Sequence, residues 1–159
     1  MIRRFAAAAA LVLALGLSGC AATVHLEAAQ DANDPLCADV TVRLPDAIQH
    51  LERRWTDAQS TGAWADEEGT AVILSCGVTP PGPTTLQCVT FDGVDWIVDP
   101  EALPMQRITT YGRTPATQVY VDTSRISPDQ VLAAVSRLVS SIPAESRCVD
   151  PDEATKVDE

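Results

Sequence analysis

The sequence has few basic residues for its length. Only 11 of its 159 residues are Lys or Arg, whereas 22 are Asp or Glu, which gives a net charge of −11 at pH 7. The phosphate backbone of a nucleic acid would repel such a chain, and an anionic lipid surface would not hold it by charge. The composition therefore argues against nucleic acid as a partner and against a membrane contact of purely electrostatic origin.

The sequence also lacks the patterns of common catalytic and metal sites. The five cysteines form no C-x-x-C pair, so the spacing of a zinc site is absent. The two histidines, His25 and His50, have no nearby Ser or Cys in a recognisable nucleophile motif. No glycine-rich phosphate loop follows a strand. We therefore predict no catalytic residue, no metal site and no cofactor.

An N-terminal leader is present. Arg3 and Arg4 precede an uncharged run of mostly Ala and Leu over Phe5–Leu17, which is shorter than the roughly 20 residues of a transmembrane helix. The following Leu17-Ser18-Gly19-Cys20 resembles a bacterial lipobox. We predict a signal peptide over residues 1–19, a lipid on Cys20, and attachment to the extracytoplasmic face of the cell membrane through that lipid. The alternative is an ordinary secretory leader with a chance cysteine.

The rest of the chain divides into a tether, one domain and a tail. Residues 20–33, rich in Ala, Thr and Asp, are predicted to be the lipidated tether. Residues 34–148 are predicted to form a single α+β domain, since this length suits one hydrophobic core. Residues 149–159 are acidic, offer little to bury, and are expected to be disordered.

The predicted domain begins and ends with a helix. Asp34-Pro35 starts the first helix, a second short helical turn is expected around Ile48 and Leu51, and residues 59–69 are expected to be a loop. The last helix follows Ser127-Pro128-Asp129-Gln130, a capping box. Five strands lie between them: Thr70–Cys76, Leu86–Phe91, Val94–Val98, Arg107–Tyr111 and Thr117–Val121. The expected fold is α+β, with a largely antiparallel sheet of about four to five strands and two helices packed on one face.

Several short segments together resemble a known family. They are Cys37 at a helix start, Leu44-Pro45, Ala63-Trp64, Ile73–Val78 (ILSCGV), Gly93–Trp96 (GVDW) and Thr109–Pro115 (TTYGRTP). As a set they are similar to an actinobacterial lipoprotein family catalogued as domain of unknown function 3515. The resemblance implies a lipid-anchored envelope protein of an actinobacterium, and it brings no assigned activity.

Four cysteines remain besides Cys20, and they allow three disulfide connectivities. Cys37 and Cys76 lie in segments that carry the resemblance, and a helix start beside a strand end can bring their Cα atoms within bonding range. Cys88 and Cys148 depart from the family pattern, and they are the pair that remains. We predict Cys37–Cys76 and Cys88–Cys148.

Aromatic residues and arginines suggest a candidate binding surface. Aromatic rings can stack on sugars, and arginines can hold carboxylates through two hydrogen bonds. Arg53 and Arg54 lie near the first helices. The surface is predicted to contain Trp64, Asp95, Trp96, Tyr111 and Arg113. The alternative is that the tryptophans belong to the core and that Asp95 and Arg113 pair to fix the loops.

Two classes of function follow. The first is a non-enzymatic module that binds an envelope protein or a cell-wall component. The second is a cell-wall-acting hydrolase or transferase with Asp95, or the acidic run Asp66-Glu67-Glu68, as acid or base. An enzyme would place Asp95 in an open pocket with a shifted pKa, whereas a structural role would bury it against an arginine.

Overall fold

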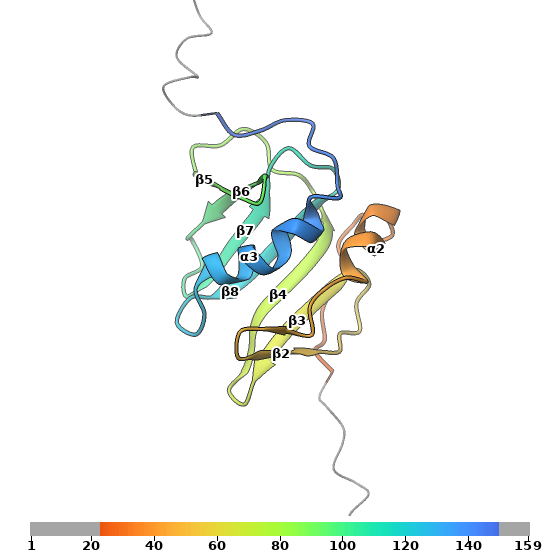
Figure 1. The fold of residues 1–159 in the computed structure, drawn as a ribbon, viewed down its shortest axis with the longest axis vertical. Helices are drawn as coiled ribbons and strands as arrows, with labels where there is room; N and C mark the ends of the chain where they lie inside the picture. The colour runs from red at the N-terminus through yellow and green to blue at the C-terminus, as the bar shows by residue number, and fades with distance from the viewer. Residues whose placement is uncertain (1–22, 150–159) are drawn as a thin grey trace, which may run out of the picture.

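The structure, a computed structural model, describes residues 23–149. In this range the chain has an α+β fold with two helices and one antiparallel sheet of eight strands (Figure 1). The predicted signal peptide, the predicted lipidation site Cys20 and residues 150–159 of the predicted tail lie outside the described residues. Among the described residues, no helix has the length and apolar character needed to cross a membrane.

The sheet has more strands than the four to five predicted. Neighbouring strands follow the order β1-β2-β3-β4-β8-β7-β6-β5. The strands are β1 (Ala47–Ile48), β2 (Leu51–Arg54), β3 (Thr61–Asp66), β4 (Gly69–Val78), β5 (Gln87–Phe91), β6 (Val94–Asp99), β7 (Met105–Thr110) and β8 (Ala116–Asp122). The five predicted strands correspond to β4–β8, so the three extra strands all lie before β4.

The extra strands replace a predicted helical turn and a predicted loop. Ile48 and Leu51 are three residues apart, which fits one face of a helix, but they lie opposite each other in the β1–β2 hairpin. Gln49 turns the chain there with a φ of 56°. Strand β3 is made mainly of small residues, so it lacks the bulky β-branched side chains of a typical strand, yet five of its six residues are buried.

The later strands follow the turn signals in the sequence. Asp92 and Gly93 have φ values of 47° and 74°, as a type I′ turn between β5 and β6 requires. Strands β7 and β8 pair across the turn that contains Gly112. These two hairpins build one end of the sheet, where the candidate site lies.

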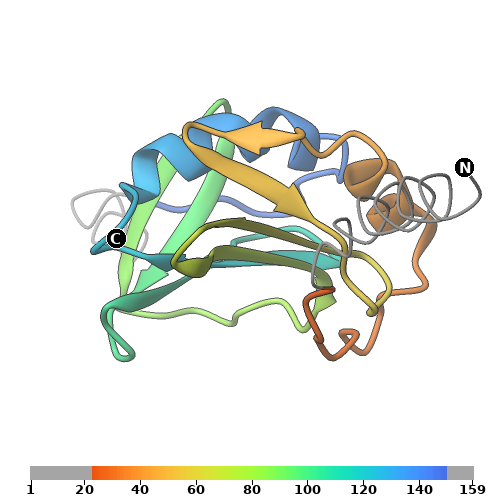
Figure 2. The same cartoon turned by 90° about the horizontal axis from the view of Figure 1, so that it is seen from below.

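Both helices cover the same face of the sheet (Figure 1). Helix α2 (Pro35–Thr41) starts at Asp34, whose side chain accepts a hydrogen bond from the backbone N–H of Leu36 at 2.8 Å. Helix α3 (Pro128–Val139) begins after Ser127 as predicted, although the Ser127 side chain makes no capping bond. Figure 2 shows the β1–β2 hairpin beside α3 on that face, so sheet, hairpin and helices enclose the core.

The described part of the predicted tether lies against the domain. Val24 forms an isolated parallel bridge with Thr56, and its N–H donates to the carbonyl of Trp55 at 2.8 Å. Asp31 N–H donates to the carbonyl of Gly77 at 2.9 Å, and Ala32 is only 3% exposed. Residues 23–33 are therefore held by the fold over much of their length.

Two disulfides tie the ends of the domain to the sheet. Cys37 of α2 is bonded to Cys76 of β4, with their Cα atoms 5.4 Å apart. Cys88 of β5 is bonded to Cys148, which follows α3, with Cα atoms 6.5 Å apart. These are the pairs expected from the sequence.

Candidate functional site

The two tryptophans of the predicted binding surface lie in the core. Trp64 and Trp96 are both 0% exposed. The indole N–H of Trp64 donates to the carbonyl of Pro45, and that of Trp96 donates to the hydroxyl of Ser136, each at 3.0 Å. Because both side chains are fully buried and each indole N–H is paired inside the protein, neither ring is available to a ligand. The prediction that Trp64 and Trp96 belong to a binding surface is therefore wrong, and the alternative that both belong to the core is correct.

The other three predicted residues come together in one pocket. Asp95 of β6 lines this pocket together with Tyr111 and Arg113 of the β7–β8 turn. The pocket has a volume of about 350 Å³. We call it the Arg113 pocket. Its other lining residues are Thr90, Gly93, Ala144, Ser146, Arg147 and Cys148.

One wall of the Arg113 pocket is the segment that follows α3, residues 144–148. The N–H groups of Glu145 and Ser146 donate to the carbonyl of Gly112 at 2.7 and 3.4 Å. Gly112 has a φ of +66°, and a Cβ atom there would lie 2.0 Å from the carbonyl oxygen of Ser146. The close approach of the wall to the β7–β8 turn therefore requires glycine at this position.

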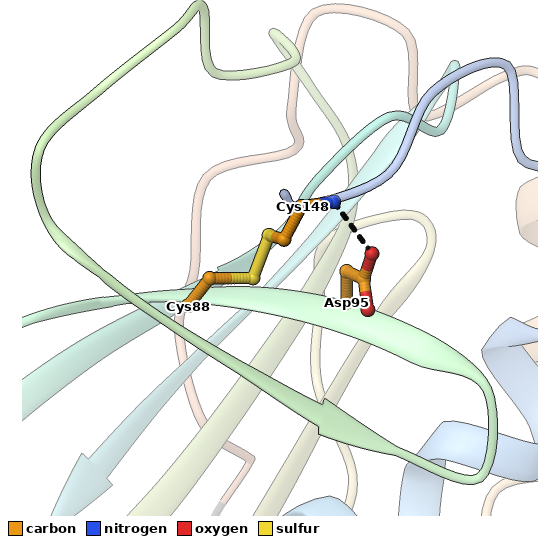
Figure 3. A group of neighbouring side chains, drawn as sticks. All are labelled: Cys88, Asp95 and Cys148. Carbon is orange, nitrogen blue, oxygen red and sulfur yellow. Dashed lines mark hydrogen bonds between the residues drawn. A yellow bond between two sulfur atoms is a disulfide. The ribbon is translucent and has the colours of Figure 1, made fainter. Parts of the chain in front are cut away.

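Asp95 fastens this wall to the sheet. Its carboxylate accepts hydrogen bonds from the Thr90 hydroxyl at 2.7 Å and from the backbone N–H of Cys148 at 2.8 Å. Figure 3 shows the carboxylate beside the Cys88–Cys148 disulfide. Because the two sulfurs are bonded to each other, they offer no thiolate with which Asp95 could bind a metal ion. Both oxygens of Asp95 thus have a structural partner.

Arg113 is the most unusual group of the pocket. The residue is only 5% exposed, and its guanidinium donates to the carbonyls of Ile142 and Gly93 while Nε has no partner. Burial lowers the pKa of Arg113 below its ordinary value, and the charge of Asp95 opposes this effect. In the described part of the chain, the hydrogen-bond acceptors of this buried cation are neutral carbonyls and not carboxylates.

A comparison with protein families shows to which family the chain belongs. The sequence model of DUF3515, described as a protein of unknown function, matches residues 5–147. The chain belongs to the DUF3515 family. No curated protein and no solved structure matches it. Membership in the domain of unknown function 3515, inferred from short segments, is therefore confirmed. The match includes all residues of the Arg113 pocket except Cys148.

The acidic run of this DUF3515 protein lies in the β3–β4 turn, away from the Arg113 pocket. Asp66 forms an ion pair with Arg125 and also accepts a hydrogen bond from the N–H of Glu68 at 2.8 Å. Arg125 in turn donates to the carbonyl of Gly69 at 2.9 Å. The structure thus uses Asp66 to close the turn and to hold the loop before α3.

Two exposed residues of the DUF3515 protein were missed by the sequence analysis. Arg147 adds a second cation to the rim of the Arg113 pocket, but it lies in a segment without periodic pattern. Trp55 is 79% exposed, and its setting among charged and polar neighbours was the available signal. It lines a second pocket of about 440 Å³, the Trp55 pocket, with Asp46, Arg53, Arg54 and Thr56.

Proposed function

We propose that this DUF3515 protein is a lipid-anchored binding module of the cell envelope, and that its Arg113 pocket holds an anionic group of a cell-wall component. The observation that supports the pocket is Arg113 itself, a nearly fully buried cation whose hydrogen-bond acceptors among residues 23–149 are neutral carbonyls. A buried charge without an opposite charge in contact is costly, and an anion in the pocket would offset that cost.

The rest of the pocket suits a carboxylate or a phosphate. Arg147 is exposed at the rim, where its guanidinium can form hydrogen bonds with an anion through two N–H groups. Tyr111 and Ser146 add hydroxyl donors. The carboxylate of Asp95 also lines the pocket and accepts hydrogen bonds from Thr90 and Cys148. Its negative charge opposes an anion, but the two cations Arg113 and Arg147 outnumber it.

The envelope location rests on the leader and on the cysteines. The lipobox Leu17-Ser18-Gly19-Cys20 predicts acylation of Cys20, which would hold the protein on the extracytoplasmic face of the membrane. Two disulfides in a domain of this size agree with an oxidising compartment. The described chain starts and ends at opposite ends of the long axis, so the Arg113 pocket, walled by residues 144–148, lies far from the anchored end (Figure 1).

The pocket can be tested by sedimentation with purified, protein-free bacterial cell walls. The experiment compares the wild-type protein with Arg147→Glu and with Arg137→Glu, which makes the same charge change at an exposed residue of α3 outside the pocket. Loss of one charge-assisted hydrogen bond costs about 1.5–3 kcal/mol, so Arg147→Glu should weaken binding by about tenfold or more. Arg137→Glu should bind like the wild type.

The outcomes separate the two parts of the proposal. Equal losses in both arginine variants would indicate unspecific charge attraction, and no sedimentation of the wild type would exclude the wall as partner. The anchor is tested separately by the N-terminal mass of the mature protein. An unmodified N-terminus at a residue other than Cys20 would refute the anchor and leave the pocket result standing.

A further inference from the structure

Trp55 is exposed although the chain has only three tryptophans. The other two, Trp64 and Trp96, are 0% exposed, whereas Trp55 is 79% exposed at the end of β2. Tryptophan is rarely left in water to this extent without a partner surface, because its ring is large and apolar. Its N–H also gives it a preference for boundaries where one side is apolar and the other is wet.

The start of the described chain is fastened to the backbone of Trp55. Val24 N–H donates to the Trp55 carbonyl at 2.8 Å, and Asp57 N–H donates to the Val24 carbonyl at 3.3 Å. The Asp57 carboxylate also holds the next two residues, with His25 Nδ1 at 2.6 Å and the N–H of Leu26 at 2.9 Å. Trp55 and Val24 therefore occupy the same end of the molecule.

This attachment sets a short distance between Trp55 and the predicted anchor. Val24 is the fourth residue after Cys20. A fully extended chain spans at most about 3.5 Å per step, or roughly 14 Å over these four steps. An acylated Cys20 lies at the membrane surface, where the headgroup layer is itself roughly 5–7 Å thick. An anchored protein thus cannot carry Trp55 far from the bilayer.

We infer that Trp55 inserts its ring into the headgroup region of the anchoring membrane and thereby fixes the orientation of the domain. This inference rests on the proposed acylation of Cys20. Tryptophan is the side chain most typical of this region of a bilayer. Arg54 also lines the adjoining Trp55 pocket. Its guanidinium contacts the exposed carboxylate of Glu52 at 3.3 Å, and the phosphate of a phospholipid headgroup could replace this exposed partner.

The contact can be measured through the fluorescence of Trp55. The full-length chain is produced in a host that acylates lipoproteins and is reconstituted into phosphatidylethanolamine and phosphatidylglycerol vesicles, with or without bromine atoms on the acyl chains. Wild type and Trp55→Phe are compared, so that the difference spectrum reports Trp55 alone. Brominated lipid should quench most of this difference signal. The emission of Trp55 in the vesicles should also lie at shorter wavelength than that of an indole in water.

Controls separate this contact from the anchor. Mass spectrometry and flotation with the vesicles report acylation, and they should be the same for the wild type and Trp55→Phe. Flotation without quenching of Trp55 would overturn the membrane contact while the anchor stands. An emission shift that depends on protein concentration, without quenching by bromine, would assign Trp55 to a second copy of the chain. Absence of the acyl mass would overturn the anchor and this inference together.

Discussion

Replacing Cys88 and Cys148 together by serine tests how the wall of the Arg113 pocket is held. The disulfide joins β5 to the segment that follows α3. No other covalent bond fastens residues 144–148 to the sheet within the described chain. The double variant should therefore lower the stability of the domain and loosen one side of the pocket.

The size of the effect follows from the loop that the disulfide closes. Its cysteines are 60 residues apart, and the chain-entropy model gives about 4 kcal/mol for a loop of this length. The non-covalent contacts of the segment remain in the variant, namely the bonds of Glu145 and Ser146 to Gly112 and of Cys148 to Asp95. We expect a loss of about 2–4 kcal/mol, because measured values commonly fall below the entropy estimate.

Urea unfolding, followed by far-UV circular dichroism, measures the loss of stability, and binding to cell walls measures the state of the pocket. The control is Cys37→Ala with Cys76→Ala, which removes the other, buried disulfide, whose cysteines do not line the pocket. It should lower stability but leave the affinity of the remaining folded protein unchanged. A loss below about 1 kcal/mol in the Cys88/Cys148 variant, with unchanged wall binding, would refute this reasoning.

Three further predictions concern the core and the start of the described chain. Ser136→Ala should cost about 1–2.5 kcal/mol in urea unfolding, since the buried indole N–H of Trp96 loses its acceptor while alanine favours the helix by about 0.5 kcal/mol. Leu132→Ala, at 1% exposure, should cost about 2–5 kcal/mol; a cost below about 0.5 kcal/mol would contradict its placement. The hydrogen bond from His25 lowers the pKa of Asp57 below 3.8. The contact between Asp57 and His25 should thus be fully present above the ordinary pKa of an aspartate. It should be lost as the pH falls through the lowered pKa of Asp57 in the folded protein, and NMR titration can follow this loss.

The parts of the fold predicted from sequence are those with strong local signals. Asp92-Gly93 accepts the positive φ values of a tight hairpin, and Pro128 with its apolar stripe fixes the last helix. Strands β1–β3 lacked such signals. Ile48 and Leu51 satisfy helical and hairpin spacing equally, and only the long-range pairing of β2 with β3 decides between them.

The candidate site was predicted in part for a similar reason. The TTYGRTP and GVDW segments carry Tyr111, Arg113 and Asp95, and antiparallel pairing of β6 with β7 brings them to one end of the sheet. The sequence alone could not show that Trp55 is exposed and Trp64 is buried, since both are tryptophans and their exposure depends on which side of the chain meets the core. Arg147 was missed because its place in the pocket depends on a disulfide and on the approach to Gly112, which leave no periodic pattern.

The two pockets divide the molecule into an inner and an outer end under the proposed anchoring. The full chain has a net charge of −11, so charge gives it no attraction to an anionic bilayer. The orientation must then come from the short link to Cys20 and from the ring of Trp55. The same geometry turns the end of the described chain, and with it Arg113 and Arg147, away from the membrane and toward the wall (Figure 1). Removal of Trp55 should then weaken wall binding of the membrane-bound protein while leaving that of a protein released from the membrane unchanged. Equal weakening in both forms would show that Trp55 acts on the pocket through the fold and not through orientation.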